Sequence, residues 1–146
     1  MTAQGGVVLD ASAALAWALR DADSEFEATL DLLMTDGFLL VPELWHAEMA
    51  NALRTALRVG RVSTEFVSGL CEQLEYLDIR TDVVGCGIRR LALQAHTHGL
   101  TAYDTAYLLL AKDRGLPLAT FDRHLAAAAA DAQIPLVIDM GSTLRR

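Results

Sequence analysis

The sequence of 146 residues lacks the features that define several large classes of protein. No apolar run approaches the roughly 20 residues that a helix needs to cross a bilayer, which argues against a membrane protein. The first residues carry no basic stretch ahead of an apolar one, so we expect no secretion signal. With only 3 prolines and no linker of low complexity, the composition indicates a single compact, helix-rich domain over residues 1–146.

Cysteine and histidine do not occur at the spacings that metal-binding motifs require. Cys71 and Cys86 are far apart in the sequence, and we expect two buried free thiols in a reducing, cytoplasmic compartment. The histidines, at positions 46, 96, 98 and 124, are too scattered for a zinc site. No nucleophilic triad, phosphate-binding loop or dinucleotide-binding fingerprint is present either. These absences leave the acidic residues as the best candidates for chemistry.

Basic residues are scarce, with 12 Lys and Arg against 19 Asp and Glu and a net charge of −7. This balance argues against a protein that binds nucleic acid through many non-specific phosphate contacts. It does not exclude a protein that acts on nucleic acid through bound divalent cations. Lys112 is the single lysine, and Arg54, Arg58, Arg89 and Arg90 are candidates for substrate or partner contacts, although ion pairs on solvated helix faces explain them more simply.

Short apolar segments alternate with longer helical ones along the chain. The expected strands or apolar runs lie at residues 7–9, 38–41, 116–120 and 136–138. The expected helices lie at about residues 11–19, 23–35, 42–59, 63–77, 82–98, 101–114 and 122–131. This alternation predicts an α/β sandwich with a short, mostly parallel central sheet flanked by helices.

Four acidic residues stand at informative places in this pattern. Asp10 and Asp122 each follow a predicted strand, and ligands of such sheets bind outside the carboxyl ends of the strands. Glu48 lies inside a predicted helix, and Asp104 lies in the first turn of another. If the fold gathers these four carboxylates, their mutual repulsion calls for a divalent cation, and oxygen ligands favour Mg²⁺ or Mn²⁺.

Three polar neighbours can support such a site. Ser12 lies two residues after Asp10, and Thr120 lies two residues before Asp122, so both offer hydroxyls to a metal-bound water. Asn51 lies one helical turn beyond Glu48 and can reach the same side.

Each acid also has a simpler explanation. Asp10 and Asp122 can cap the helices that follow them, and Asp104 with Thr101 is close to a capping box. Glu48 can be an ordinary glutamate at the margin of an apolar helix stripe. Capping and metal binding are compatible, because helix N-termini commonly face a site.

Four segments together give the chain a family resemblance: Val7–Ser12, Glu48–Leu53, Tyr103–Ala111 and Leu118–Asp122. In this order and at these intervals, they resemble the PIN-domain ribonucleases, in particular the VapC-type toxins of bacterial toxin–antitoxin pairs. The resemblance implies a PIN-like three-layer sandwich and an Mg²⁺- or Mn²⁺-dependent endoribonuclease that cleaves RNA by metal-activated water. It assigns catalysis and metal binding to Asp10, Glu48, Asp104 and Asp122, and supporting positions to Ser12, Asn51 and Thr120. It also implies a homodimer and a cognate antitoxin partner, and the lack of a long apolar run predicts no membrane association.

Other functions fit the sequence less well. A Mg²⁺-dependent phospho-acceptor domain needs a pair of acids after the first strand and a lysine late in the sheet, whereas Asp10 stands alone and Lys112 lies in a helix. A phosphatase with an aspartyl nucleophile needs an acid where this chain has Ser12. A PIN-like binding module without catalysis stays open, although the complete set of four acids disfavours it.

Overall fold

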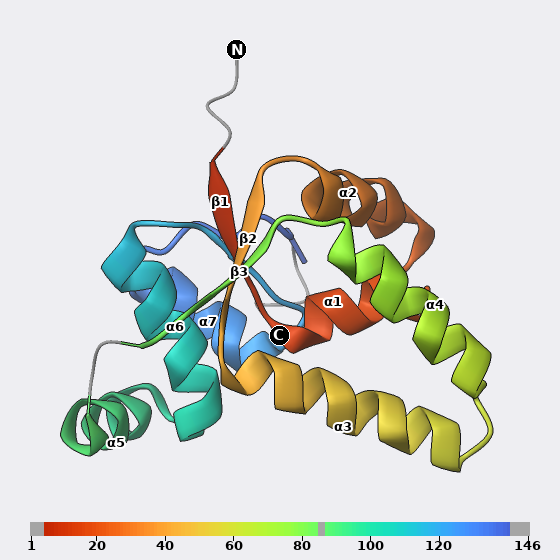
Figure 1. The fold of residues 1–146 in the computed structure, drawn as a ribbon. Coiled ribbons are helices and arrows are strands. Elements are labelled where there is room, and N and C mark those ends of the chain that lie inside the picture. The colour runs from red at the N-terminus through yellow and green to blue at the C-terminus, as the bar shows by residue number, and fades with distance from the viewer. Residues whose placement is uncertain (1–4, 85–86, 141–146) are drawn as a thin grey trace.

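The computed structural model describes residues 5–84 and 87–140, and it contains one sheet of four parallel strands. The strands lie side by side in the order β3-β2-β1-β4 (Figure 1). Their bounds are β1 (Gly6–Leu9), β2 (Phe38–Pro42), β3 (Ile79–Asp82) and β4 (Leu118–Ala119). The first strand therefore lies inside the sheet, between the second and the last.

Seven helices flank this sheet in the described part of the chain. They are α1 (Ala11–Ala18), α2 (Ser24–Thr35), α3 (Leu44–Arg58), α4 (Thr64–Glu75), α5 (Ile88–His98), α6 (Ala102–Arg114) and α7 (Arg123–Asp131). Helices α5 and α6 lie on one side of the sheet, and α2 and α4 lie on the other (Figure 1). The predicted α/β fold, with a parallel sheet between helices, is confirmed.

The core explains why the central elements are so apolar. Val8, Leu9, Leu39 and Val41 on the two central strands are at most 1% exposed. Helix α6 is buried on all sides over residues 105–111 and packs against β1 and β2. A helix enclosed in this way needs apolar residues around its whole circumference. It is therefore a rigid support for the side chains in its first turns.

The prediction of a helix over residues 82–98 is wrong at its start. Asp82 ends β3, an edge strand that the sequence did not reveal, and α5 begins only at Ile88. Residues 85 and 86 lie outside the described part. The strand escaped prediction because Ile79 is the single apolar residue of its four, so it contains no apolar run. Arg80 instead covers the ring of Phe38, with its guanidinium carbon 4.0 Å from the ring centre.

Three smaller predictions also need correction. Residues 136–138 form no strand, and only an isolated parallel bridge joins Leu136 to Leu118. Pro42 ends β2 instead of beginning the next helix. Cys71 is exposed on α4 instead of buried, and Cys86 lies outside the described residues. None of the described helices is both long enough and apolar enough to cross a membrane.

Candidate active site

The register of two neighbouring strands brings Asp10 beside Thr120. Strands β1 and β4 pair in parallel, with Leu9 opposite Ala119, so the next residue of each strand lies at the same edge of the sheet. The backbone N–H of Asp10 donates to the carbonyl of Ala119 at 3.0 Å, which extends this pairing. The sequence placed Asp10 and the 120–122 segment at one edge, and the structure brings them together there.

Two hydroxyls fix the carboxylate of Asp10, which is only 5% exposed. Its Oδ2 accepts hydrogen bonds from Ser12 Oγ at 2.6 Å and from Thr120 Oγ1 at 2.7 Å. The two hydroxyl oxygens lie 3.2 Å apart and complete a triangle. Asp10 precedes α1 but forms no side-chain capping bond, so the capping explanation for this residue is wrong.

The same two hydroxyls organise the loop that leads into α7. Ser12 Oγ accepts the backbone N–H of Phe121, and Thr120 Oγ1 accepts the backbone N–H of Asp122, each at 2.9 Å. Asp122 then caps α7, because its Oδ1 accepts the N–H of Leu125 at 3.0 Å. Its predicted capping role is thus confirmed, and the cap directs this carboxylate to the same edge of the sheet.

Asp104 and Glu48 come from two helices, α6 and α3. Asp104 is half-buried in the first turn of α6, where its backbone N–H donates to the capping hydroxyl of Thr101 at 3.1 Å. Glu48 is half-buried on α3, at the margin of the stripe that contains Trp45 and Met49. Asn51 is exposed one turn further on, and within the described residues its side chain makes no hydrogen bond to the site.

Tyr107 is the member of this group that the sequence did not reveal. Its ring is completely buried, and its hydroxyl donates to Glu48 Oε1 at 2.5 Å across 59 positions of sequence. A signal existed, because Tyr107 lies three residues after Asp104 and therefore on a neighbouring part of the helix surface. Only the packing of α6 against the sheet shows that this tyrosine reaches a residue of α3.

The four carboxylates influence one another electrostatically. Burial raises the pKa of Asp10, and the charge of Asp122 adds to this effect against the hydrogen bonds from Ser12 and Thr120. Burial also raises the pKa of Asp104, with further contributions from the charges of Asp122 and Asp10. Asp10, Asp104 and Asp122 therefore share one electrostatic environment.

Glu48 belongs to this environment as well. Burial raises its pKa, the charges of Asp10 and Asp104 raise it further, and the hydrogen bond from Tyr107 opposes them. The pKa of the Tyr107 hydroxyl is in turn raised strongly, first by burial and then by its bond to Glu48. This tyrosine is therefore a neutral donor that keeps Glu48 in place.

The chemistry of these side chains fits a hard divalent cation. None of the four carboxylates forms an ion pair with Lys or Arg within residues 5–84 and 87–140, so their charge is not neutralised by those side chains. Oxygen ligands with excess negative charge are those that Mg²⁺ and Mn²⁺ prefer. In the same ranges, however, no three Asp, Glu, His or Cys side chains are close enough together to hold an ion. Shared coordination therefore requires these side chains to approach one another further.

Comparison with known proteins identifies the class to which this fold and this edge belong. The family model of the PIN domain matches residues 7–131, and the chain belongs to the PIN-domain family. PIN domains are generally nucleases, and they usually use divalent metal ions.

A solved structure supports this assignment. The chain is similar to PAE2754 from Pyrobaculum aerophilum, with 28% sequence identity and a TM-score of 0.62. The similarity covers 86% of this chain and 80% of that protein. No curated protein matches the chain.

Proposed function

We propose that this PIN domain is an endoribonuclease that depends on Mg²⁺ or Mn²⁺ and acts as the toxin of a type II toxin–antitoxin pair. The observation that carries the proposal is the buried carboxylate of Asp10, bound by Ser12 and Thr120 and exposed to the charge of Asp122. A buried acid that is already bound by two hydroxyls, and that has other acids instead of a basic partner nearby, is poised for a cation.

Each residue of the site has a distinct part in this proposal. Asp10, Glu48, Asp104 and Asp122 hold the cation. A bound divalent cation supplies positive charge for the phosphodiester and the acidity that activates water for hydrolysis. Ser12 and Thr120 hold Asp10 in one orientation, and residues that orient ligands in this way commonly change metal affinity or activity by roughly 10–100-fold.

Surface features support RNA and protein partners. Arg54 and Arg58 are exposed on the same helix as Glu48 and four residues apart, so they can contact the phosphates of one strand. Ile88 and Leu93 on α5 are 87% and 58% exposed, which supports a homodimer that covers this helix.

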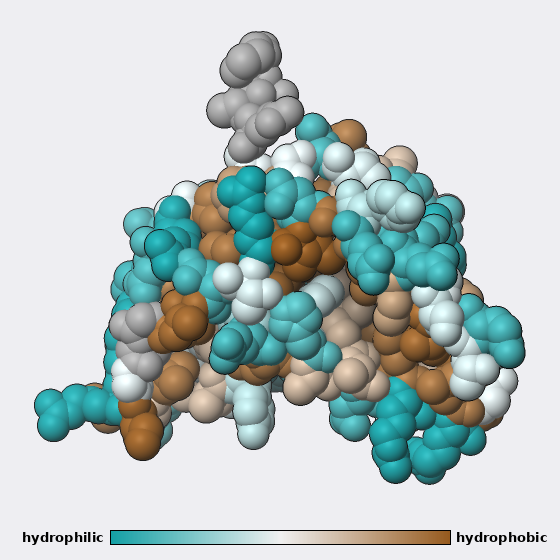
Figure 2. Space-filling view, in the orientation of Figure 1, coloured by the Kyte–Doolittle hydropathy of each residue, from teal (hydrophilic) through white to brown (hydrophobic). Residues whose placement is uncertain are grey.

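An apolar groove supports the antitoxin as a partner. It lies between α3 and α4, is lined by Leu53, Leu57, Val67 and Leu74 among others, and has a volume of about 330 Å³. Apolar side chains come to the surface between these two helices (Figure 2). A groove of this kind suits the apolar face of an antitoxin segment.

The proposed function is tested by incubating wild type and Asp10→Asn with cellular RNA in Mg²⁺, in Mn²⁺ and in EDTA, and by sequencing the resulting ends. We expect cuts with a 5′-phosphate and a 3′-hydroxyl from the wild type with either metal, and none in EDTA or from the variant. A folded wild type that cuts no RNA with either metal overturns the proposal in favour of a silent binding module. Equal cutting by the variant removes Asp10 from the chemistry.

A further inference from the structure

A second pocket opens directly beside the proposed active site. It has a volume of about 470 Å³, and Phe121, the residue between Thr120 and Asp122, forms part of its wall. The rest of the wall comes from Ala16 of α1, the connection from α1 to α2, the first turn of α2, Arg123 of α7 and Met140. The four acids proposed to bind the cation do not line this pocket, so its ligand is a separate question.

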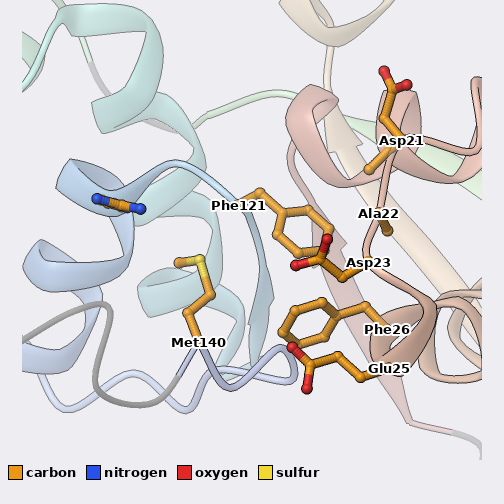
Figure 3. Close-up of a pocket in the computed structure, with 9 residues that line it drawn as sticks. Asp21, Ala22, Asp23, Glu25, Phe26, Phe121 and Met140 are labelled. Carbon is orange, nitrogen blue, oxygen red and sulfur yellow. The ribbon is translucent and has the colours of Figure 1, made fainter.

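Two aromatic rings form the apolar side of this pocket. Phe26 of α2 and Phe121 meet edge to face, with ring centres 5.4 Å apart and an angle of 77° between the planes. Both side chains are only half-buried, so part of each ring stays available to a ligand. Met140 lies across the pocket from them (Figure 3). Exposed aromatic surface with a thioether opposite suits a flat, apolar-faced ligand.

The polar groups of the pocket have both signs. Asp23 and Glu25 place their carboxylates beside the two rings (Figure 3), and in the described part of the chain neither forms a hydrogen bond or an ion pair from its side chain. Arg123 also lines the pocket and has no acidic partner among those residues. Asp21 at the rim is already paired with Arg61. The pocket thus contains carboxylate acceptors and one planar donor that have no such partner among the described residues, together with aromatic surface.

We propose that this pocket binds a guanine base of the RNA strand that lies in the active site, an inference that rests on the proposed nuclease function. Guanine carries two adjacent donors, N1–H and N2–H, which match the two oxygens of a carboxylate. Its other edge carries the acceptors O6 and N7, which an arginine binds with two hydrogen bonds. Asp23 or Glu25 receives the donor edge, and Arg123 reaches the acceptor edge. One face of the base packs against the exposed part of one of the two rings, Phe26 or Phe121, and the other ring, which is nearly perpendicular to it, meets the edge of the base.

The other bases match this set of groups less well. Adenine has an acceptor at N1, which a carboxylate repels, and neither pyrimidine combines a pair of donors with the O6 and N7 edge. A purely cationic ligand suits Asp23 and Glu25 but meets Arg123 in the same pocket. The position also suits a base adjacent to the cut, because the backbone N–H of Phe121 is bound to Ser12 of the active site.

Binding of free nucleotides tests the pocket independently of catalysis. We would titrate 5′-GMP and 5′-AMP into wild type, the double variant Asp23→Asn/Glu25→Gln, and Arg123→Gln, and follow binding by calorimetry or chemical shifts. We expect GMP to bind on the order of tenfold more tightly than AMP, and each variant to lose about tenfold in GMP affinity. Asp36→Asn and Lys112→Gln are matched controls, because both residues are exposed and lie outside the pocket. They should bind GMP as the wild type does.

Sequencing of the RNA ends tests the same pocket during cleavage. The wild type should show guanine enriched at one fixed position beside the cut, and the double variant should still cut but lose this enrichment. Equal affinity for GMP and AMP, or variants that bind GMP like the wild type, overturns the proposal. Tighter binding of argininamide than of GMP overturns it in favour of a cationic ligand.

The two proposals fail in different ways. If the wild type binds GMP selectively at this pocket but cuts no RNA, the nuclease function is wrong and the guanine site stands. If the wild type cuts RNA but neither binds GMP nor favours guanine, the guanine site is wrong and the nuclease function stands. Asp10→Asn connects the two tests, because it should bind GMP normally and cut nothing.

Discussion

The two halves of the proposed active site are built by different means. In the sheet half, Asp10 is almost fully buried, and Ser12 and Thr120 bind it at 2.6 and 2.7 Å. In the helix half, Glu48 and Asp104 are half-buried on α3 and α6. The register of two parallel strands fixes the first half, whereas the packing of α6 onto the sheet and of α3 onto α1 positions the second.

This difference indicates which side chains can move when a cation binds. The hydroxyls of Ser12 and Thr120 hold the carboxylate of Asp10 in one orientation, so this carboxylate should move least when a cation binds. Asp104 keeps more freedom, since part of its side chain faces solvent, and Glu48 is equally half-buried but is held by a single hydrogen bond, from Tyr107. No three of the described acids are close enough together to hold one ion, and the helix half is the side that can close the remaining distance. Substitutions in the two halves should therefore have different effects.

The largest effect is expected for Asp10→Asn, which removes the negative charge of the carboxylate that is held in one orientation. Nuclease activity in Mg²⁺ should fall by more than about 100-fold, because even residues that only orient metal ligands are worth roughly 10–100-fold. The melting temperature at neutral pH should not fall, since a buried charge with a raised pKa is removed. Cleavage rates and thermal melting measure the two outcomes. Loss of folding in this variant would contradict the view that Asp10 serves function at a cost in stability.

The sheet half could be predicted from the sequence, and the helix half only in part. Asp10 and Asp122 follow apolar runs, and parallel strands bring their carboxyl ends to one edge, so local pattern was sufficient there. Glu48 was identified, but its bond to Tyr107 depends on how α3 and α6 pack across 59 positions. No local pattern contains that information.

The same limit explains the strand and the pocket that the sequence did not reveal. Strand β3 is a half-exposed edge with one apolar residue, so its pairing with β2 creates the strand more than its composition does. The pocket beside Phe121 needs Phe26, which is 95 positions away and meets it only in the folded chain. Local sequence pattern thus predicted the acids at the strand ends, whereas strand β3 and the pocket depend on tertiary packing.

A second, smaller effect is expected for Thr120→Val, which keeps the shape of the side chain and removes its hydroxyl. Asp10 then keeps only Ser12 as a hydroxyl donor, and the N–H of Asp122 loses its acceptor. We expect a loss of about 10–100-fold in activity or in Mn²⁺ affinity. Calorimetric titration with Mn²⁺ measures the affinity without relying on catalysis. Thr105→Val is the matched control, because its buried hydroxyl binds the carbonyl of Thr101 instead of the site.

A third effect, of about tenfold or less, is expected for Tyr107→Phe in the helix half. The ring still fills the core, but Glu48 loses the donor that orients it. Mn²⁺ affinity and cleavage rate should fall together, because the same carboxylate serves both. Tyr103→Phe provides the comparison, since Tyr103 is 66% exposed on the same helix and should change neither quantity. If the two variants behave alike, the bond between Tyr107 and Glu48 has no functional weight.

The smallest effect is the pH dependence of stability in EDTA. The pKa values of Asp10, Glu48 and Asp104 are raised in the folded state. The folded protein therefore binds protons more tightly than the unfolded chain, and protonation of these groups stabilises the fold. This stabilisation is fully present below the pKa values of the unfolded chain, 3.8 for Asp and 4.5 for Glu. It is lost as the pH rises through the raised values. The melting temperature should thus fall as the pH rises above about 4.5 toward 7, and Mg²⁺ at pH 7 should reverse the fall.

The ion pairs on the surface do not cause this fall of the melting temperature with rising pH. Asp78 and Asp113 have pKa values lowered by their arginine partners, so their contribution grows with rising pH and is complete near the ordinary value of 3.8. The change of the melting temperature with pH above that range therefore reflects the carboxylates of the proposed active site. Asp10→Asn should reduce this pH dependence of the melting temperature more than Asp104→Asn does, because water screens the half-exposed Asp104 more effectively than the buried Asp10. If Asp104→Asn reduces the pH dependence more than Asp10→Asn does, the helix half, and not the sheet half, holds most of the unfavourable charge.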